Sequence, residues 1–306
     1  MLTLLHMPFY SYDDVLRISR IIQETPCEIS EELRGWNWFA PPLLPVHGLQ
    51  INVSDLSFSC KTGRLAFLRY RMRVKERNNE RLRFGAFVHR VISMATNAAK
   101  SILYSSTPNN GAELLEKMLK EMERILQHRD FPENYVKVFK TLWNRAALTY
   151  SSSLDKVLEL SRYLSLDGLV NRVVPWICEF PVDGRPLGLS RAARIDALIP
   201  PALIIEFKTR RPSRSTEVAL TAYALSFECQ YRIPIDHAII LYIEFEPNGS
   251  SFRTYEKVLK IDESLRLEFI EIRDLYASKA SLDVDPGIPE NCDAYCPYLE
   301  VCRNGR

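Results

Sequence analysis

The sequence predicts a mixed α/β protein in which a helical N-terminal half precedes a central sheet covered by helices. Three observations lead to this prediction. Helical periodicity dominates residues 84–164. Short apolar runs separated by turn residues dominate residues 173–259. The second region follows the order β-β-β-α-β-β-α, and helices that alternate with strands in this way cover a mixed sheet.

Composition is that of an ordinary globular protein. The chain has 306 residues, of which 46% are hydrophobic and 25% are charged. No apolar run reaches the roughly 20 residues that a membrane-spanning helix needs. The apolar start, Met1 to Tyr10, lacks a basic leader and a small-residue cleavage site, which indicates folded structure and not a secretory signal. We therefore expect a soluble, cytoplasmic protein without a membrane partner.

The N-terminal half is expected to be mostly helical. Tyr12 to Gln23 has the spacing of an amphipathic helix, and Glu32 to Val46, rich in Trp and Pro, suits an extended segment packed on a larger body. Ser54 can cap a short helix that carries Cys60 near its end. Longer helices are predicted over Phe84 to about Ser105, Ala112 to His128, and Tyr135 to about Leu164 in one or two pieces.

The C-terminal half is expected to supply the sheet. Strands are predicted over Val173–Pro181, Leu187–Ile199, Ala202–Thr209, Ala238–Phe245 and Phe252–Leu259. Turns separate them at Asp183-Gly184, Pro200-Pro201 and Pro247-Asn248-Gly249. Helices are predicted over Thr216–Glu228 and Glu263–Ala277, before a polar tail that begins after Ser281.

Two basic groups stand out although the net charge is only +2. The stretch from Arg69 to Arg83 contains seven basic residues and only two acidic ones. A second group consists of Lys208, Arg210, Arg211 and Arg214. Each group alone is typical of a solvated surface. Because the two groups flank the carboxylates described next, they favour contact with phosphate.

Two carboxylates and a lysine are predicted to converge at the end of a strand. Side chains alternate faces along a strand, so Ile204, Glu206 and Lys208 share one face. Asp196 precedes the Pro200-Pro201 turn, so its strand can run antiparallel beside the Glu206 strand. The alternative is a set of unrelated solvent-facing charges. The four apolar residues that begin the Glu206 strand favour a buried, central strand instead.

This set suits phosphodiester hydrolysis. Mg²⁺ and Mn²⁺ prefer oxygen ligands, which Asp196, Glu206 and the backbone carbonyl of Phe207 can supply. A bound ion activates water and neutralises the leaving oxygen, and Lys208 can hold the water and stabilise charge. His89 is a candidate fourth ligand, although a lone helical histidine is usually a packing residue. Tyr223 can reach a phosphate or pack in the core.

Three cysteines in the tail have the spacing C-x3-C-x5-C: Cys292, Cys296 and Cys302. Thiolates in sets of four bind an iron–sulfur cluster or zinc. Cys60 is the preferred fourth ligand, with Cys27 as a competitor. Cys178 and Cys229 have the setting of buried structural thiols. The absence of a second C-x2-C pair favours iron–sulfur over zinc, and disulfides are the third alternative.

These residues, in this order, resemble the RecB-like PD-(D/E)XK nucleases that carry iron–sulfur clusters. Within them the chain is similar to the CRISPR-associated exonucleases of the archaeal Csa-type branch, whose N-terminal signature resembles Glu31 to Trp38. The resemblance implies a restriction-endonuclease-like core over residues 171–281. It also implies an N-terminal segment over 1–83 with one cluster cysteine, a helical part over 84–170 and a cysteine tail over 282–306.

The resemblance also implies function. His89, Asp196, Glu206 and Lys208 would form the active site. A [4Fe–4S] cluster would be held by Cys60, Cys292, Cys296 and Cys302. The activity would be trimming of DNA ends, single-stranded ones above all, beside CRISPR integration proteins in antiviral defence.

Two departures stand against a full match. Ala219 replaces the Gln that usually lies four residues before the tyrosine, and the first cysteine gap is three residues where two is commoner. Two further functions remain open. One is a non-catalytic DNA-binding scaffold, and the other is a DNA-repair nuclease of the same fold.

Overall fold

The computed structural model describes residues 2–5, 8–46, 48–76, 80–160, 163–210 and 212–304, with the backbone alone for 2–5. Its centre is a six-stranded sheet in the order β1-β6-β5-β4-β3-β2. The strands are β1 (Leu2–Leu5), β2 (Ile177–Val182), β3 (Ala193–Ile199), β4 (Leu203–Lys208), β5 (His237–Phe245) and β6 (Phe252–Lys260). Only β4 and β5 pair in parallel, so the sheet is mixed.

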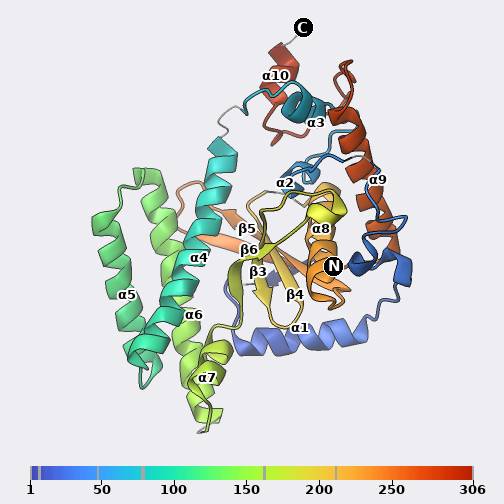
Figure 1. Ribbon diagram of the computed structural model, residues 1–306. Helices are drawn as coiled ribbons and strands as arrows, with labels where there is room; N and C mark the ends of the chain where they lie inside the picture. Colours follow the sequence, from blue (N-terminus) through green and yellow to red (C-terminus); the bar gives the residue numbers. More distant parts are fainter. Residues whose placement is uncertain are drawn as a thin grey trace.

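Helices cover both faces of this sheet (Figure 1). The group α4 to α7 lies on one side, and α8 and α9 lie on the other. The helices are α1 (Tyr12–Glu24), α2 (Val53–Leu56), α3 (Arg64–Ala66), α4 (Glu80–Ser106), α5 (Gly111–His128), α6 (Glu133–Leu160), α7 (Leu166–Val173), α8 (Arg214–Tyr231), α9 (Glu263–Ala280) and α10 (Leu299–Asn304). Short 3-10 turns occupy Glu31–Leu33, Gly35–Asn37 and Arg185–Leu187, and a π-helical turn occupies Phe67–Arg71.

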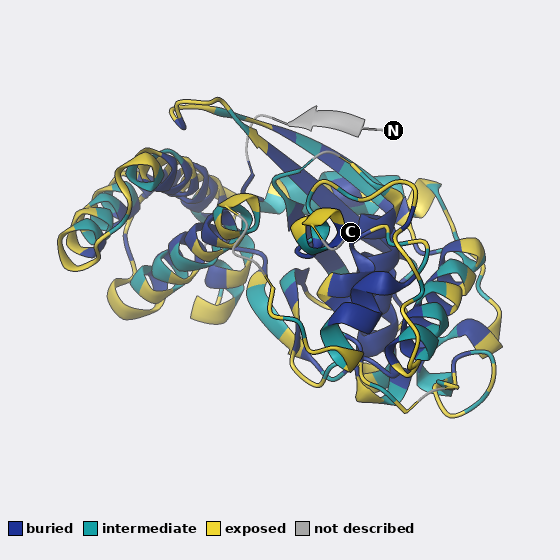
Figure 2. Ribbon diagram, turned by 90° about the horizontal axis from the view of Figure 1, so that it is seen from above, coloured by how far each residue is buried: buried dark blue, intermediate teal, exposed yellow. Residues whose placement is uncertain are grey.

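Two apolar cores result, one on each face of the sheet. Along β4, Ile204 belongs to the core beneath α8 and α9, whereas Ile205 and Phe207 belong to the core beneath α4 and α6. Figure 2 shows α8 buried along most of its length. Its many Ala, Ser and Thr residues allow this helix to lie close to the sheet and to the segments that cover it.

The predicted fold class is confirmed: a mixed sheet flanked by helices follows a helical N-terminal part. The predicted order β-β-β-α-β-β-α corresponds to β2 through α9. The first strand, β1, extends this sheet by pairing with β6. Paired residues such as Leu2 and Lys257 are 255 positions apart in sequence, too distant for a local pattern to reveal.

Several predicted boundaries were wrong. Ser54 does not cap α2, because the helix starts at Val53 after Asn52, and Cys60 lies in the turn that follows the helix. The strand predicted from Leu187 begins only at Ala193, because Gly188 adopts a left-handed φ of +70° after the 3-10 turn. The strand predicted from Val173 likewise starts late, since residues 166–173 form α7.

The segment predicted as extended between Glu32 and Val46 forms two 3-10 turns that pack on α8 and α9. A buried ion pair holds it there. Arg266 and Glu228 are both fully buried, and the Arg266 guanidinium donates to the Glu228 carboxylate at 2.8 Å and to the Leu33 carbonyl at 2.9 Å. The Gly35 N–H also donates to Glu228, at 2.8 Å. The segment from Glu31 to Trp38, which resembles the family's N-terminal signature, therefore packs against α8 and α9.

Replacing Gly35 with alanine should destabilise the protein by about 3 kcal/mol, the upper range for overpacking a tight contact. An added Cβ would lie 2.1 Å from the Leu225 carbonyl oxygen, which is backbone and cannot rotate away. Urea denaturation measures the change in the free energy of unfolding. The matched control is Gly48→Ala, because a Cβ at Gly48 meets nothing within 4 Å. Equal stability of the two variants would contradict this packing.

Candidate active site and cysteine cavity

The centre of the candidate site is the point at which β3 and β4 separate. The two strands pair from Ile199–Leu203 to Ala197–Ile205. The next residue of β3, Asp196, does not continue the ladder. Its carboxylate Oδ2 accepts the Phe207 N–H at 2.8 Å instead. A side-chain bond thus replaces a ladder bond and fixes the Asp196 carboxylate beside the end of β4.

His89 reaches this carboxylate from α4, on the far side of the sheet from α8. Its Nδ1 lies 3.1 Å from Asp196 Oδ1, and its ring contacts the edge of the Phe207 ring at a centroid distance of 5.8 Å. Phe207 in turn packs on Trp176, which is fully buried. Packed aromatic rings therefore hold the histidine in place against the carboxylate.

Glu206 and Lys208 lie next to Asp196 at the end of β4. The Lys208 ammonium donates to Glu206 Oε1. The second oxygen, Oε2, is buried and makes no hydrogen bond. A buried carboxylate oxygen without a partner is costly, and a cation is the group that would satisfy it. Among the described residues, however, no three His, Cys, Asp or Glu side chains are already arranged to hold a metal ion.

The charges at this site are strongly coupled. Burial and the Asp196 charge raise the pKa of Glu206 to about 7, although Lys208 opposes the shift. Burial would also raise the pKa of Asp196, but His89, Lys208 and the Phe207 N–H outweigh it and lower that pKa. For His89, burial lowers the pKa, but the Asp196 carboxylate outweighs it and the net pKa is raised. The carboxylates therefore repel each other and are held close by neighbouring cations.

This coupling predicts a pH dependence of metal affinity. Protonated Glu206 cannot bind a cation, so protons compete with the metal below its pKa of about 7. Below that value we expect the Mn²⁺ affinity to fall by at least about tenfold per pH unit, because the candidate ligand His89, whose pKa is also raised, gains a proton as well. Calorimetric titration with Mn²⁺ between pH 5.5 and 8.5 measures this. An affinity independent of pH across that range would exclude Glu206 as a ligand.

The remaining predicted site residue, Tyr223, and the nearby basic residues lie on or beside α8. Tyr223 lies on α8, and burial together with the Glu206 and Asp196 charges raises the pKa of its phenol well above 10, so the phenol stays protonated beside the carboxylates. Ala219, one helical turn earlier, is buried. Arg214 forms ion pairs with Glu217 and Glu268. Arg211 of the second basic group lies outside the described residues.

Two members of the first basic group, Arg69 and Arg71, form ion pairs within the protein. Arg69 lies 3.0 Å from the buried Asp55 carboxylate and also pairs with Glu76. Arg71 pairs with Asp283 at the start of the tail. Arg77 lies outside the described residues. These pairs favour a structural role for Arg69 and Arg71, and phosphate contact by the rest of this group stays a prediction.

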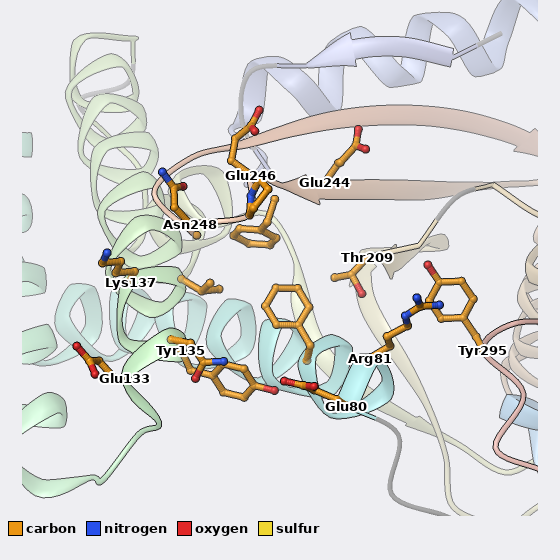
Figure 3. Close-up of a pocket in the computed structure, with 16 residues that line it drawn as sticks. Glu80, Arg81, Glu133, Tyr135, Lys137, Thr209, Glu244, Glu246, Asn248 and Tyr295 are labelled. Atoms are coloured by element: carbon orange, nitrogen blue, oxygen red, sulfur yellow. The ribbon is translucent and has the colours of Figure 1, made fainter. Parts of the chain in front are cut away.

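A cavity of about 810 Å³ opens beside the end of β4, and no pattern in the sequence predicted it (Figure 3). Its walls come from the start of α4, the start of α6, the β5–β6 turn and the cysteine tail. Figure 3 places Arg81 of α4 close to Tyr295 of the tail, and the guanidinium lies 5.3 Å from the ring centroid. Thr209 lines the same cavity, one residue after Lys208. The cavity therefore lies beside the end of β4, but its lining does not include His89, Asp196, Glu206 or Lys208.

Four cysteines line a second, smaller cavity near the C-terminus: Cys60, Cys292, Cys296 and Cys302. All seven cysteines are free thiols, so none forms the disulfide considered above. Burial raises the pKa of Cys296 to about 12, and the neighbouring Cys60 and Cys302 contribute. Cys27 does not line this cavity; it lies near Asp236 and Asp262. Packing thus gathers four thiols, of which the first and last, Cys60 and Cys302, are 242 residues apart in sequence.

Comparison with known proteins identifies the family. The sequence model of the family described as CRISPR-associated exonuclease Csa1 matches residues 9–305. This chain belongs to the CRISPR-associated exonuclease Csa1 family. The resemblance inferred from the sequence is thus confirmed at the level of the family, and the matched range spans the candidate site residues and the four cysteines of the small cavity.

Two curated relatives in the Csa1 family come from archaea, and both are named CRISPR-associated exonuclease Csa1. The protein of Saccharolobus solfataricus is 35% identical over 295 residues, which cover 96% of this chain and 99% of the relative. The protein of Thermoproteus tenax is 28% identical over 297 residues, which cover 95% and 99%. No solved structure matches the chain. No helix in the described part of this Csa1 family member is both long and apolar enough to cross a membrane.

Proposed function

We propose that this protein is a divalent-metal-dependent DNA exonuclease. Its metal ligands would be Asp196, Glu206, the Phe207 carbonyl and His89. The observation that carries the proposal is the buried, unpartnered Oε2 of Glu206 beside a second buried carboxylate. Two adjacent buried carboxylates, one of which (Glu206) has a raised pKa, are a poor way to stabilise a fold, but they are suited to a hard cation. Mn²⁺ and Mg²⁺ are the candidate ions.

A bound divalent ion would supply an activated water and neutralise the leaving oxygen. The residues of the chain would do the rest. Lys208 lies within hydrogen-bonding reach of Glu206, and it would shift its ammonium toward the attacked phosphate when a cation neutralises that carboxylate. Its three donors can hold the attacking water and stabilise charge on phosphorus. The Asp196 carboxylate, fixed by the Phe207 N–H, would keep His89 oriented. The protonated Tyr223 can donate to a phosphate oxygen.

The cysteine cavity is proposed to hold a [4Fe–4S] cluster. Four thiols from two distant segments line it, and thiolates in this number are the ligands of such clusters. A cluster would bind the cysteines as thiolates, so the proton that burial keeps on the Cys296 thiol would be released to solvent on binding. It would also fasten a tail that contains little regular structure. Zinc is the competing occupant. Metal analysis after anaerobic purification separates the two.

The relatives carry names that link them to CRISPR, and we infer the same setting for this chain. Its substrate would be DNA with free, single-stranded ends. Its product would be trimmed DNA of the kind that CRISPR integration proteins insert as new spacers, and these proteins would be its partners. A DNA-repair role for the same activity is the competing setting, and co-purification with integration proteins would distinguish them.

An assay on end-labelled DNA tests the proposal. With Mn²⁺ or Mg²⁺ the protein should shorten labelled single strands from an end, and excess chelator should stop it. Lys208→Met should lower kcat by about 100-fold or more while DNA binding persists, because the lysine acts on the transition state. The control is Lys156→Met, which replaces an exposed lysine on α6 that pairs with Asp13 at 2.9 Å. DNA binding without cleavage by the wild-type protein would instead support a scaffold, as the loss of Gln at Ala219 allows.

A further inference from the structure

Arg210 lies two residues beyond Lys208 and turns its side chain toward the cysteine cavity. The side chain is only 9% exposed. Its Nη2 donates to the Ser57 carbonyl at 2.6 Å and to Thr216 Oγ1 at 3.2 Å. Ser57 lies on the chain that leads to Cys60, so one bond ties the end of β4 to the cysteine-bearing N-terminal segment.

The same guanidinium also contacts the cysteine tail. Its Nη1 lies 3.8 Å from Asp293 Oδ2, and its centre lies 5.8 Å from the Tyr295 ring centroid. It also lies 5.4 Å from the Phe58 ring centroid. Phe58 and Asp293 are wall residues of the cysteine cavity. Arg210 therefore touches both sides of that cavity: the segment before Cys60 and the segment between Cys292 and Cys296.

Arg210 is close in sequence to Lys208, the candidate catalytic lysine. Lys208 and Arg210 are separated by one residue, so a shift of the Arg210 backbone must displace the end of β4. Catalysis is sensitive to such shifts, since a misplacement of about 1 Å can lower a rate about 100-fold. A planar guanidinium with five donors can hold several partners at fixed angles, which an ammonium cannot.

We propose that Arg210 is a positioning residue that couples the occupancy of the cysteine cavity to the position of Lys208. The proposal rests on the proposed nuclease function and extends it, because it assigns Arg210 a role that requires no contact with the substrate. With the cavity filled, the two cysteine segments hold the guanidinium and the end of β4 is fixed. With the cavity empty, the tail releases Arg210 and Lys208 loses its alignment.

The test compares anaerobically purified protein before and after iron removal, in the wild type and in Arg210→Gln. Hydrogen–deuterium exchange of the peptide containing Glu206 to Arg210 reports the strand end, and kcat and KM are measured with Mn²⁺ on single-stranded DNA. In the wild type, iron removal should speed exchange and lower kcat about 10- to 100-fold, with KM within about twofold. Arg210→Gln should retain its iron. Even with iron bound, it should show the rapid exchange and the low kcat expected of iron-free wild type. Iron removal should then change neither its exchange rate nor its kcat.

Arg210→Lys keeps the charge near Asp293 but loses the planar fork, so it should restore kcat in part. Arg185→Gln is the control, because Arg185 is exposed and pairs only with Asp183. Wild-type kcat and exchange in iron-loaded Arg210→Gln would overturn the coupling, as would unchanged exchange in iron-free wild type. Protein that is purified anaerobically without iron would also overturn it. Failure of the wild type to cleave DNA would reject the nuclease function alone, since exchange is read without cleavage.

Discussion

Replacing Asp196 with asparagine should lower metal-dependent DNA cleavage by at least about 10³-fold, equivalent to about 4 kcal/mol of transition-state stabilisation. The amide oxygen can still accept the Phe207 N–H, so the strand end should stay folded. The negative charge that attracts the ion and orients His89 is lost. Single-turnover cleavage with saturating Mn²⁺ measures the rate, and calorimetry measures the weakened Mn²⁺ binding.

The control for this substitution is Asp183→Asn. Asp183 is also acidic and forms an ion pair, with Arg185 at 2.6 Å, but it lies in the turn after β2. It should retain wild-type cleavage. Cleavage by Asp196→Asn within tenfold of the wild type, with the fold intact, would show that the metal is held elsewhere.

Replacing Cys296 with serine should remove the bound iron and lower the melting temperature by on the order of 10 °C, because metal binding at a cysteine site contributes directly to folding. Cys296 lines the small cavity with the three other cysteines, and its segment contains the Asp293 that contacts Arg210. Iron content, the visible absorption spectrum and thermal unfolding under anaerobic conditions measure the effect.

Cys27→Ser is the matched control, because Cys27 competes with Cys60 on sequence grounds but does not line the cavity. It should keep its iron and its melting temperature. Loss of iron in Cys27→Ser, or full iron in Cys296→Ser, would refute the ligand set. If the purified protein is colourless and contains zinc, the cavity holds zinc and not a cluster, and the nuclease proposal is unaffected.

Local periodicity was enough to predict five of the six strands, β2 through β6, although not all of their boundaries. Alternation along β4 placed Ile204 and Ile205 on opposite faces, and the structure assigns them to different cores. The Pro200-Pro201 turn was enough to predict that Asp196 and Glu206 lie on adjacent antiparallel strands. Both predictions depend on residues a few positions apart, where side-chain direction follows from the backbone.

Other features depend on packing between distant segments, which no local pattern contains. The contact of His89 with Asp196 requires α4 to cross the sheet at one angle. A glycine is required at position 35 because its backbone lies against Leu225 and Glu228 on α8, where a Cβ would clash. Arg210 was interpreted as part of a basic surface, yet its guanidinium is enclosed by Ser57, Thr216 and the tail. Charge alone did not distinguish a phosphate ligand from a structural arginine.

The anomalous signal of Mn²⁺ in crystals soaked near pH 8 tests the central claim most directly. The pH keeps Glu206 ionised, since its pKa is about 7. A peak at ligand distance from Asp196 and Glu206, with His89 beside it, is the predicted result. No peak there at saturating Mn²⁺, or a peak elsewhere that supports cleavage, would contradict the proposed metal site.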